Sequence, residues 1–453
     1  MPIRPLDAPR ALDVQQVDVG PPRQALALAT ASERGLGAAA RAGGTADFRR
    51  RAVIECLGTL GTLRSAREPL AGETWQTPLA SERRLLAQVD AIVGLGPTAL
   101  AQAVDLALDP DVPDPARVFA SLFVLGSVDG PGWLKPLQTL FVTATTRHPE
   151  EMSAAIEALS LGPNADLHRA MTPLLTHAEA RVRAAAVRVL SFRGALAAGD
   201  WQAALADPSP GVAAAAAWAP MPRLPLGQAE AALAPLLHSP HEPIAIPVLR
   251  AGLGHRLRIA YRRAAELAED RPGWADALNL LAMFGFASDA ERIAAALVSP
   301  APLPALRAAG TLGHIALVPD LIAALERPGL APADAAEARM SLWKIAGIAL
   351  ADGQGASVAR TLWERRAAHF SPHLRYRGGR PLNPAVLVAL LRSGPVQRLA
   401  RQEVYLELGA ATASAAPRFS AYDFVAVQAG SLDRLEAWCA SPDGQAATTE
   451  ALH

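Results

Sequence analysis

The sequence contains almost no lysine and almost no cysteine. Lysine occurs only at Lys135 and Lys344, so 41 of the 43 basic residues (43 − 2) are arginine. Acidic residues also number 43, and proteins that bind duplex DNA usually carry a basic excess, so a nucleic-acid partner is disfavoured. Alanine and proline are abundant too, so the arginine bias indicates a GC-rich genome rather than a preference for phosphate. Cys56 and Cys439 lie near opposite ends without metal-ligand spacing; a disulfide stays open, but a reducing compartment is the simpler expectation.

A long hydrophobic run and a targeting segment are also missing. The first residues, MPIRPLDAPRALDVQQVD, have neither the apolar core of a signal peptide nor an Arg/Ser-rich transit pattern. The longest uncharged apolar stretch, PSPGVAAAAAWAPMP, is too short and too often interrupted by proline to cross a bilayer. We therefore expect a cytoplasmic protein without a membrane partner.

Aromatic residues make up only 5% of the chain, although hydrophobic residues make up 51%. The core must therefore consist mainly of alanine, leucine and valine. Alanine is the strongest helix former, whereas sandwiches and barrels favour β-branched and aromatic residues. This composition predicts an all-α fold.

Against these absences, one helical phrase recurs through the middle of the chain. Its clearest copy is HAEARVRAAAVRVLSFRG, His177–Gly194. Apolar residues of this copy share one helix face, at positions Val182, Ala185, Ala186, Val189 and Leu190, and Arg181, Arg183 and Arg188 lie mostly off that face. Equivalent apolar positions recur every 30 to 32 residues, at Val182, Val212, Ile244, Ala275, Ala305 and Ala336. A second helix follows each copy, for example Arg258–Asp270, so the unit is a helix pair that must stack on its neighbours to bury both faces.

The phrase Val-Arg-x-Ala-Ala-x-x-x-Leu resembles that of HEAT and HEAT-like repeats. The sequence thus predicts an α-solenoid of about eight HEAT-like pairs over residues 112–350. A divergent helical cap is expected at 48–111 and a different helical region at 351–453. Residues 1–47 show little pattern, and we expect them to be partly disordered or loosely attached.

Two further phrases resemble a family of proteobacterial HEAT-repeat proteins. An N-terminal phrase of that family maps onto Leu79 to Ile92, with Gln88 and Ala91 in place of its His and Gly. A C-terminal phrase maps onto Arg377 to Pro381 and onto Gly394 to Arg398. Some members of the family are encoded near type VI secretion genes, so the resemblance implies an accessory or adaptor role. It implies no activity.

Motifs for hydrolysis and nucleotide binding are absent: the chain has no GxSxG, GxxxxGK[ST], HExxH or CxxC. The Gly-rich stretch LGTLGTLRSA (Leu57–Ala66) lacks the lysine and the preceding strand of a phosphate loop, so helix packing is favoured. We therefore expect neither catalytic residues nor a cofactor.

A metal site is disfavoured as well. HEAT-like deoxyhypusine hydroxylases bind two irons with four His-Glu dipeptides, whereas this chain has one, His241-Glu242. That dipeptide falls in HSPHE, at a turn between repeats, where a helix-capping role is favoured over zinc binding. A second His pair, in HFSPH (His369–His373), is separated by a helix-breaking proline.

The most basic stretch is WERRAAHFSPHLRYRGGRP (Trp363–Pro381). Its candidate partner-binding residues are Arg365, Arg366, Arg375, Tyr376, Arg377 and Arg380. Arginine binds carboxylate or phosphate with two parallel hydrogen bonds, and Gly378-Gly379 would let a partner approach the backbone. An exposed loop that is Arg-rich only because of genome composition is the competing interpretation.

The sequence therefore favours a non-catalytic, protein-binding scaffold or adaptor, whose partner could be a component or effector of a secretion system. The alternative is a HEAT-like nucleic-acid-binding protein or enzyme that uses the Arg365–Arg380 region.

Overall fold

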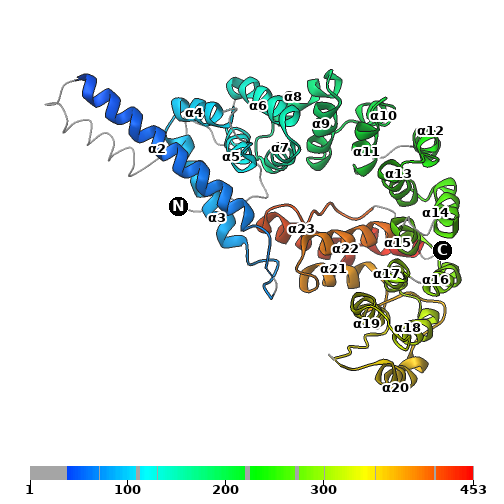
Figure 1. Ribbon diagram of the computed structural model, residues 1–453. Helices are drawn as coiled ribbons and strands as arrows, with labels where there is room; N and C mark the ends of the chain where they lie inside the picture. Colours follow the sequence, from blue (N-terminus) through cyan, green and yellow to red (C-terminus); the bar gives the residue numbers. More distant parts are fainter. Residues whose placement is uncertain are drawn as a thin grey trace. The chain divides into compact units, whose positions relative to one another are not determined.

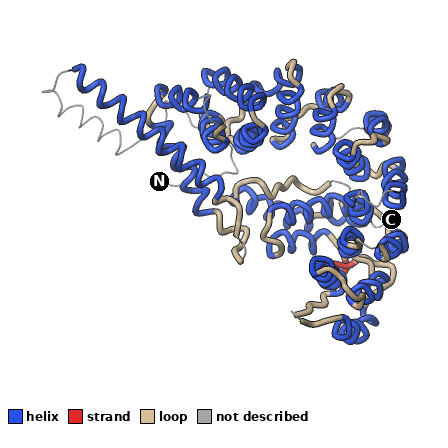
Figure 2. Tube along the Cα trace, in the orientation of Figure 1, coloured by secondary structure: helices blue, strands red, loops and turns tan. Residues whose placement is uncertain are grey.

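The computed structural model describes residues 38–70, 72–108, 113–129, 131–219, 225–270, 275–299, 301–351, 353–412 and 415–451. The described chain is helical almost throughout, and its only strands form one short antiparallel pair (Figures 1 and 2). The predicted all-α solenoid of helix pairs is confirmed. Residues 1–37 of the segment expected to be disordered lie outside the described residues, and residues 38–47 belong to the first described helix.

The chain divides into two compact units. The first contains Met1–Pro222 and the short return segment Tyr422–Gly430. Its elements before the return segment are α2 (Ala38–Ser65), α3 (Leu79–Gly94), α4 (Pro97–Leu108), α5 (Pro115–Leu125), η1 (Pro131–Trp133), α6 (Leu134–Arg147), α7 (Pro149–Leu161), α8 (Leu167–Met171), η2 (Thr172–Thr176), α9 (Ala180–Phe192), α10 (Ala198–Leu205) and α11 (Pro210–Trp218).

The second unit contains Arg223–Ala421 and Ser431–His453. Its elements are α12 (Leu226–Leu237), α13 (Glu242–Gly254), α14 (Arg258–Asp270), α15 (Ala275–Phe284), η3 (Ala287–Asp289), α16 (Ala290–Leu297), α17 (Leu303–Leu312), η4 (Ile315–Leu317), α18 (Val318–Leu325), α19 (Pro332–Ala346), α20 (Ala356–Arg366), η5 (Ala367–His369), β1 (Tyr376–Arg377), β2 (Arg380–Pro381), α21 (Pro384–Ser393), α22 (Arg398–Ala411) and α24 (Pro442–Ala451). Helix α23 (Val425–Ala440) begins in the return segment and continues into this unit.

Each unit has two layers of helices. The first helices of successive repeats pack side by side, as α5, α7, α9 and α11 in the first unit and as α13, α15, α17 and α19 in the second. The intervening helices form the other layer, where α4 contacts α6 and, in the second unit, α18 contacts both α16 and α20. Repeats therefore occur in both units, and the division between the units falls within the segment 112–350.

Proline and glycine mark the limits of the repeat helices. Pro149, Pro210 and Pro332 occupy the first turns of α7, α11 and α19, where the missing N–H costs no hydrogen bond. Helices α17 and α19 end at Gly313 and Gly347, with φ of +71° and +65°. Only glycine adopts this conformation without strain, so these two residues fix where the helices end.

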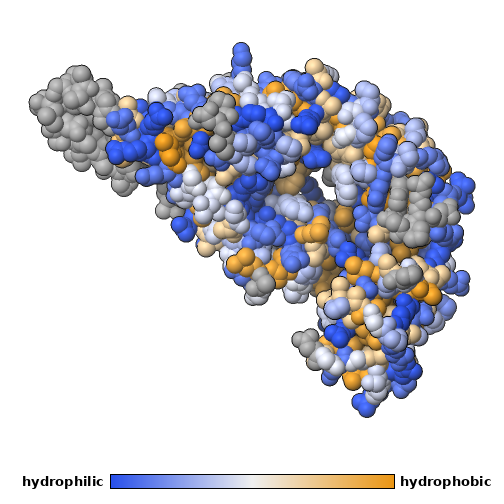
Figure 3. All heavy atoms as spheres, viewed as in Figure 1, coloured by the Kyte–Doolittle hydropathy of each residue, from blue (hydrophilic) through white to orange (hydrophobic). Residues whose placement is uncertain are grey.

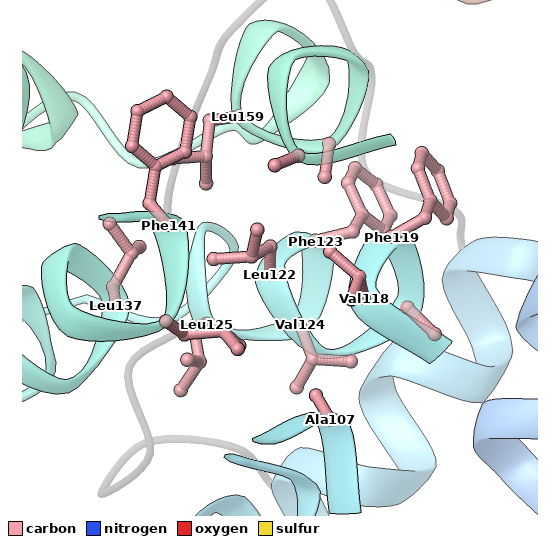
Figure 4. Close-up of a cluster of buried hydrophobic side chains, with 14 of the residues drawn as sticks. Ala107, Val118, Phe119, Leu122, Phe123, Val124, Leu125, Leu137, Phe141 and Leu159 are labelled. Carbon is pink, nitrogen blue, oxygen red and sulfur yellow. The ribbon is translucent and has the colours of Figure 1, made fainter. Parts of the chain in front are cut away.

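The core of the first unit is centred on α5, which is surrounded by α2, α4, α6 and α7. Phe119 and Phe123 stack with their ring centroids 5.6 Å apart, and Leu122 is buried beside them (Figure 4). The Gly-rich stretch Leu57–Ala66 lies mostly in α2, where a Cβ at Gly61 would lie 2.8 Å from the Ala116 Cβ. This close approach confirms the packing role for Gly61, whereas a Cβ at Gly58 would meet nothing within 4 Å.

Helix α9 confirms the predicted apolar face. Val182, Ala185, Ala186, Val189 and Leu190 are all buried. Off that face, Arg183 donates to both carboxylate oxygens of Asp207, at 2.7 and 2.8 Å, and so joins this repeat to the turn before α11. The hydrogen bonds from Arg183, helped by one from the Ser209 backbone, lower the pKa of Asp207 in spite of its burial.

We expect Asp207→Asn to lower the free energy of unfolding by about 1–2 kcal/mol at pH 7. An aspartate whose pKa is lowered by folding stabilises the protein above its unfolded pKa of about 3.9, and this contribution is lost as the pH falls through the folded pKa. The difference between wild type and variant should therefore shrink below about pH 4. Urea unfolding between pH 7 and pH 3.5 measures it. Asp166→Asn, which removes the more exposed Asp166–Arg169 pair, should cost less than about 0.5 kcal/mol, and a pH-independent gap for Asp207→Asn would contradict the assignment.

The return segment is held in the first unit by a buried arginine. Arg67, 1% exposed, donates from Nε to Glu82 (3.1 Å) and from Nη2 to the Tyr422 carbonyl (3.0 Å). The other oxygen of Glu82 accepts the Val425 N–H at 2.7 Å, and the Arg67 guanidinium lies 4.7 Å from the centroid of the Phe424 ring. One ion pair thus fixes a segment that is distant in sequence.

In the second unit, the face of the first layer is partly covered by the chain's own C-terminal region. Helices α21 and α22 pack together, and α22 contacts α13 and α15. Helix α15 is accordingly buried on most sides, with Leu278, Leu281 and Met283 all buried. A partner would not reach the surface of α15 while α22 occupies it.

Within the described residues, no single helix is both long and apolar enough to span a membrane. Helices α3 and α4 meet that test only when taken together, and the chain bends by 115° between them.

Candidate functional site

The predicted basic site forms the end of α20, the turn η5 and the hairpin β1–β2. Arg365 and Arg366 lie in the last turn of α20 and are exposed, as is Arg380 in β2. Tyr376 and Arg377 are the two residues of β1 and are buried, at 3% and 4% exposure. The six predicted residues therefore divide into an exposed and an inward-facing set.

The Gly378-Gly379 turn is occupied by a helix end of the same chain. Both glycines have positive φ, +61° and +76°, as a two-residue hairpin turn requires. Their N–H groups donate to the carbonyls of Lys344 and Ile345, at 2.5 and 3.1 Å. A Cβ at Gly379 would lie 3.1 Å from the Ala346 carbonyl oxygen. The close backbone approach expected for a partner is thus made by the C-terminus of α19, beside which the two strands lie in Figure 2.

Arg375 joins the C-terminal ends of α15 and α17. Its Nε donates to the Leu312 carbonyl at 2.7 Å and its Nη2 to the Ala282 carbonyl at 3.0 Å. Longer hydrogen bonds of 3.3 to 3.4 Å reach the carbonyls of Met283, Gly285 and Thr311. Burial, with the neighbouring charge of Arg377, lowers the pKa of Arg375 to about 10, so the side chain stays protonated at neutral pH.

Arg377 and Tyr376 extend the same attachment. Arg377 donates to the carbonyls of Gly310 and Thr311 and to the Glu407 carboxylate of α22, the last at 2.9 Å. The Tyr376 N–H donates to the Gly313 carbonyl at 2.7 Å, and its ring packs edge-on against Phe370. Because residue 313 is glycine, this approach is possible: a Cβ there would lie 2.3 Å from the Tyr376 carbonyl oxygen.

The common target of these groups is the end of a repeat helix. The last carbonyls of a helix have no partner within it and carry a partial negative charge, which a guanidinium satisfies with several donors at once. Arginines do the same elsewhere: Arg193 donates to the carbonyls of Leu159, Gly162 and Asn164 at the end of α7, and Arg366 donates to that of Gly347. Several arginines of this chain therefore have a structural role that composition alone does not reveal.

Arg365 and Arg380 remain as outward-facing cations. Both side chains are exposed. Within the described residues, neither side chain forms a hydrogen bond or an ion pair with another residue. Arg366 is exposed too, although its Nη1 bonds to the end of α19 at 3.0 Å. The exposed histidines His369 and His373 lie between them in sequence.

The predicted metal-ligand candidates do not converge. Among the described residues, no group of three or more His, Cys, Asp or Glu side chains could hold a metal ion. His241 and Glu242 lie at the start of α13, where the His241 N–H donates to the Ser239 hydroxyl. The His241 side chain does not cap α13, and the side-chain hydrogen bond at this turn is made by the Ser239 hydroxyl instead. Cys56 and Cys439 are both free.

The stacked helix pairs place the chain in the class of all-α solenoids. No family model matches the chain, and no curated protein matches it. Among solved structures, the chain is similar to human deoxyhypusine hydroxylase in complex with glycerol, at 17% sequence identity over 71% of this chain and 98% of that chain. The TM-score of this likeness is 0.23.

Proposed function

We propose that the protein is a non-catalytic scaffold that binds a partner protein through a basic rim, defined as Arg365, Arg366 and Arg380. The observation that carries the proposal is the division of the arginine segment: Arg375 and Arg377 bond inside the chain, whereas the three residues of the rim are exposed. The inward-facing arginines attach the segment to α15 and α17, and the N–H groups of Gly378 and Gly379 attach it to α19. A rigid base holds the rim in place before binding, which lowers the entropy cost of association.

The chemistry of the rim favours an acidic protein segment. Guanidinium groups form paired hydrogen bonds with carboxylates, and several exposed cations steer an acidic partner during encounter. The family resemblance makes a cytoplasmic component of a type VI secretion system the first partner to test. Phosphate would satisfy the same donors, so a nucleic acid is the competing ligand.

The test is a charge reversal with a matched control. We expect Arg365→Glu with Arg380→Glu to weaken binding of the partner at least about tenfold, because both cations become repulsive. The partner would be captured from the native host on the wild-type protein, and its affinity for each purified variant then measured. Arg181→Glu with Arg188→Glu reverses two exposed arginines of α9 and should leave that affinity unchanged.

Equal binding by both double variants would exclude the rim as the binding site. Retention of RNA or DNA on a filter at low salt, lost in the Arg365/Arg380 variant, would replace the protein partner by a nucleic acid.

A further inference from the structure

A second surface lies at the end of the first layer in the second unit. Helix α19 contacts α17, α18 and β1, and no further first-layer helix of the described chain stacks beyond it. Its buried residues face α17: the Ser341 hydroxyl donates to the Leu306 carbonyl at 2.7 Å, and a Cβ at Gly310 would lie 2.4 Å from that hydroxyl oxygen. The opposite side of α19 carries Ala333, Ala336, Met340 and Trp343, which we call the end face.

The end face corresponds to a stacking surface in the preceding repeat. Helices α17 and α19 both end at a left-handed glycine, Gly313 and Gly347, which sets them in register. This register, set by the helix ends, has an offset of 34 residues and so differs by three from the sequence-based alignment of Ala305 with Ala336. It places Met340 and Trp343 at the positions of Leu306 and Ala309. Leu306 and Ala309 are completely buried, whereas Met340 is 47% and Trp343 39% exposed.

The end face is therefore a stacking surface without an occupant in the described chain. Terminal repeats of solenoids normally carry a polar outer face, which keeps them from associating. A tryptophan and a methionine one helical turn apart break this rule. On the face that Figure 3 shows, apolar residues form several patches among hydrophilic ones.

We propose that the end face binds the end face of a second copy of this chain, with the two α19 helices antiparallel about a two-fold axis near Met340. In this antiparallel pairing, Met340 contacts Met340 of the other copy at the axis. Trp343 of each copy lies against Ala336 of the other, where the small side chain leaves room for the indole. The surface is thus complementary to itself in size, as a two-fold interface requires.

Charged residues at the edges of the end face fit the same antiparallel pairing. Glu337 and Lys344 lie along one half-buried edge of the helix, where both also act on the charge of Glu403 in α22. An antiparallel pair brings Glu337 of one copy beside Lys344 of the other, twice. Arg339 lies on the other edge, where the axis brings the two copies of this residue together. Their repulsion weakens the dimer, so removing the charge of Arg339 should strengthen it.

Sedimentation velocity on the full chain tests the proposal. A single helix pair buries less than a standard interface, so we expect a dissociation constant in the micromolar range and a dimer at about 100 μM. Met340→Glu with Trp343→Glu should be monomeric throughout, with an unchanged thermal melting profile. Val298→Glu is the matched control, because Val298 is an exposed apolar residue of the same unit at 76% exposure, and it should dimerise like the wild type.

The charged edges report on the register. Glu337→Lys alone and Lys344→Glu alone should each weaken the dimer several-fold, and the two together should restore it. Arg339→Gln should tighten it. A wild-type protein that stays monomeric at 100 μM would overturn the proposal, as would a dimer that survives the Met340/Trp343 change. These outcomes are independent of partner binding at Arg365 and Arg380, which is measured separately.

Discussion

Replacing Arg375 with alanine should lower the free energy of unfolding of the second unit by about 3–5 kcal/mol. The side chain donates to carbonyls at the ends of both α15 and α17, and these groups have no other partner within their helices. Its loss leaves the carbonyls unsatisfied and detaches the segment that also contacts α19. Urea unfolding measures the effect, and hydrogen exchange locates it in the last turns of α15 and α17.

Two variants separate this bridging role from charge alone. Arg375→Lys retains the positive charge, but an ammonium group cannot reach two helix ends at once, so it should recover less than half of the lost stability. Arg380→Ala removes an exposed arginine of the same hairpin and should change stability by less than about 0.5 kcal/mol. Equal effects of Arg375→Ala and Arg380→Ala would show that the hydrogen bonds to the helix ends do not hold the segment.

The repeat helices were predictable because their signals are local. The apolar face of α9 could be identified from the spacing of Val182, Ala185 and Leu190, and all three are buried. Likewise, the turn before Pro210 lies next to the start of α11, and Gly313 lies at the end of α17. Local signals of this kind determine where a helix begins and ends, whatever it packs against.

The roles of the arginine segment were not predictable, because they depend on contacts between distant residues. Arg375 bonds to Ala282, 93 positions earlier, and a single sequence gives no register for such a pairing. Composition suggested two interpretations, genome bias and partner binding. The structure adds a third interpretation for Arg375 and Arg377, the satisfaction of helix ends. The glycines that follow α15 and α17, Gly285 and Gly313, were the signal that could have indicated it.

The same reasoning applies to the surface left for binding. A row of stacked pairs predicts a long first-layer face, but it does not reveal that α22 returns to cover α13 and α15. Helix α22 has only a moderate apolar pattern, and its buried residues, Arg401 and Leu408, follow from where it packs. The exposed part of this layer is therefore smaller than the repeats alone imply, and it includes the end face on α19.

The second large effect is expected at Arg67. Arg67→Ala should lower the free energy of unfolding of the first unit by about 3–5 kcal/mol, because Glu82, itself 1% exposed, loses the guanidinium to which it is bonded. The Tyr422 carbonyl loses its donor at the same time. Hydrogen exchange should therefore quicken most in Tyr422–Gly430, a segment more than 350 positions away in sequence.

A double-mutant cycle distinguishes the buried ion pair from simple loss of packing. Replacing both partners, as Arg67→Met with Glu82→Leu, removes the buried carboxylate together with the guanidinium and should be less damaging than Arg67→Met alone by about 1–3 kcal/mol. Arg64→Ala is the matched control: Arg64 shares the Glu157 carboxylate with Arg67 but is 24% exposed, so its loss should cost about 1 kcal/mol or less and leave exchange in the return segment unchanged. Additive changes in the free energy of unfolding for Arg67→Met and Glu82→Leu would contradict this role of the ion pair. Arg67 would then act through its contact with the Phe424 ring, 4.7 Å away, and the Glu82 carboxylate would contribute little to holding the segment.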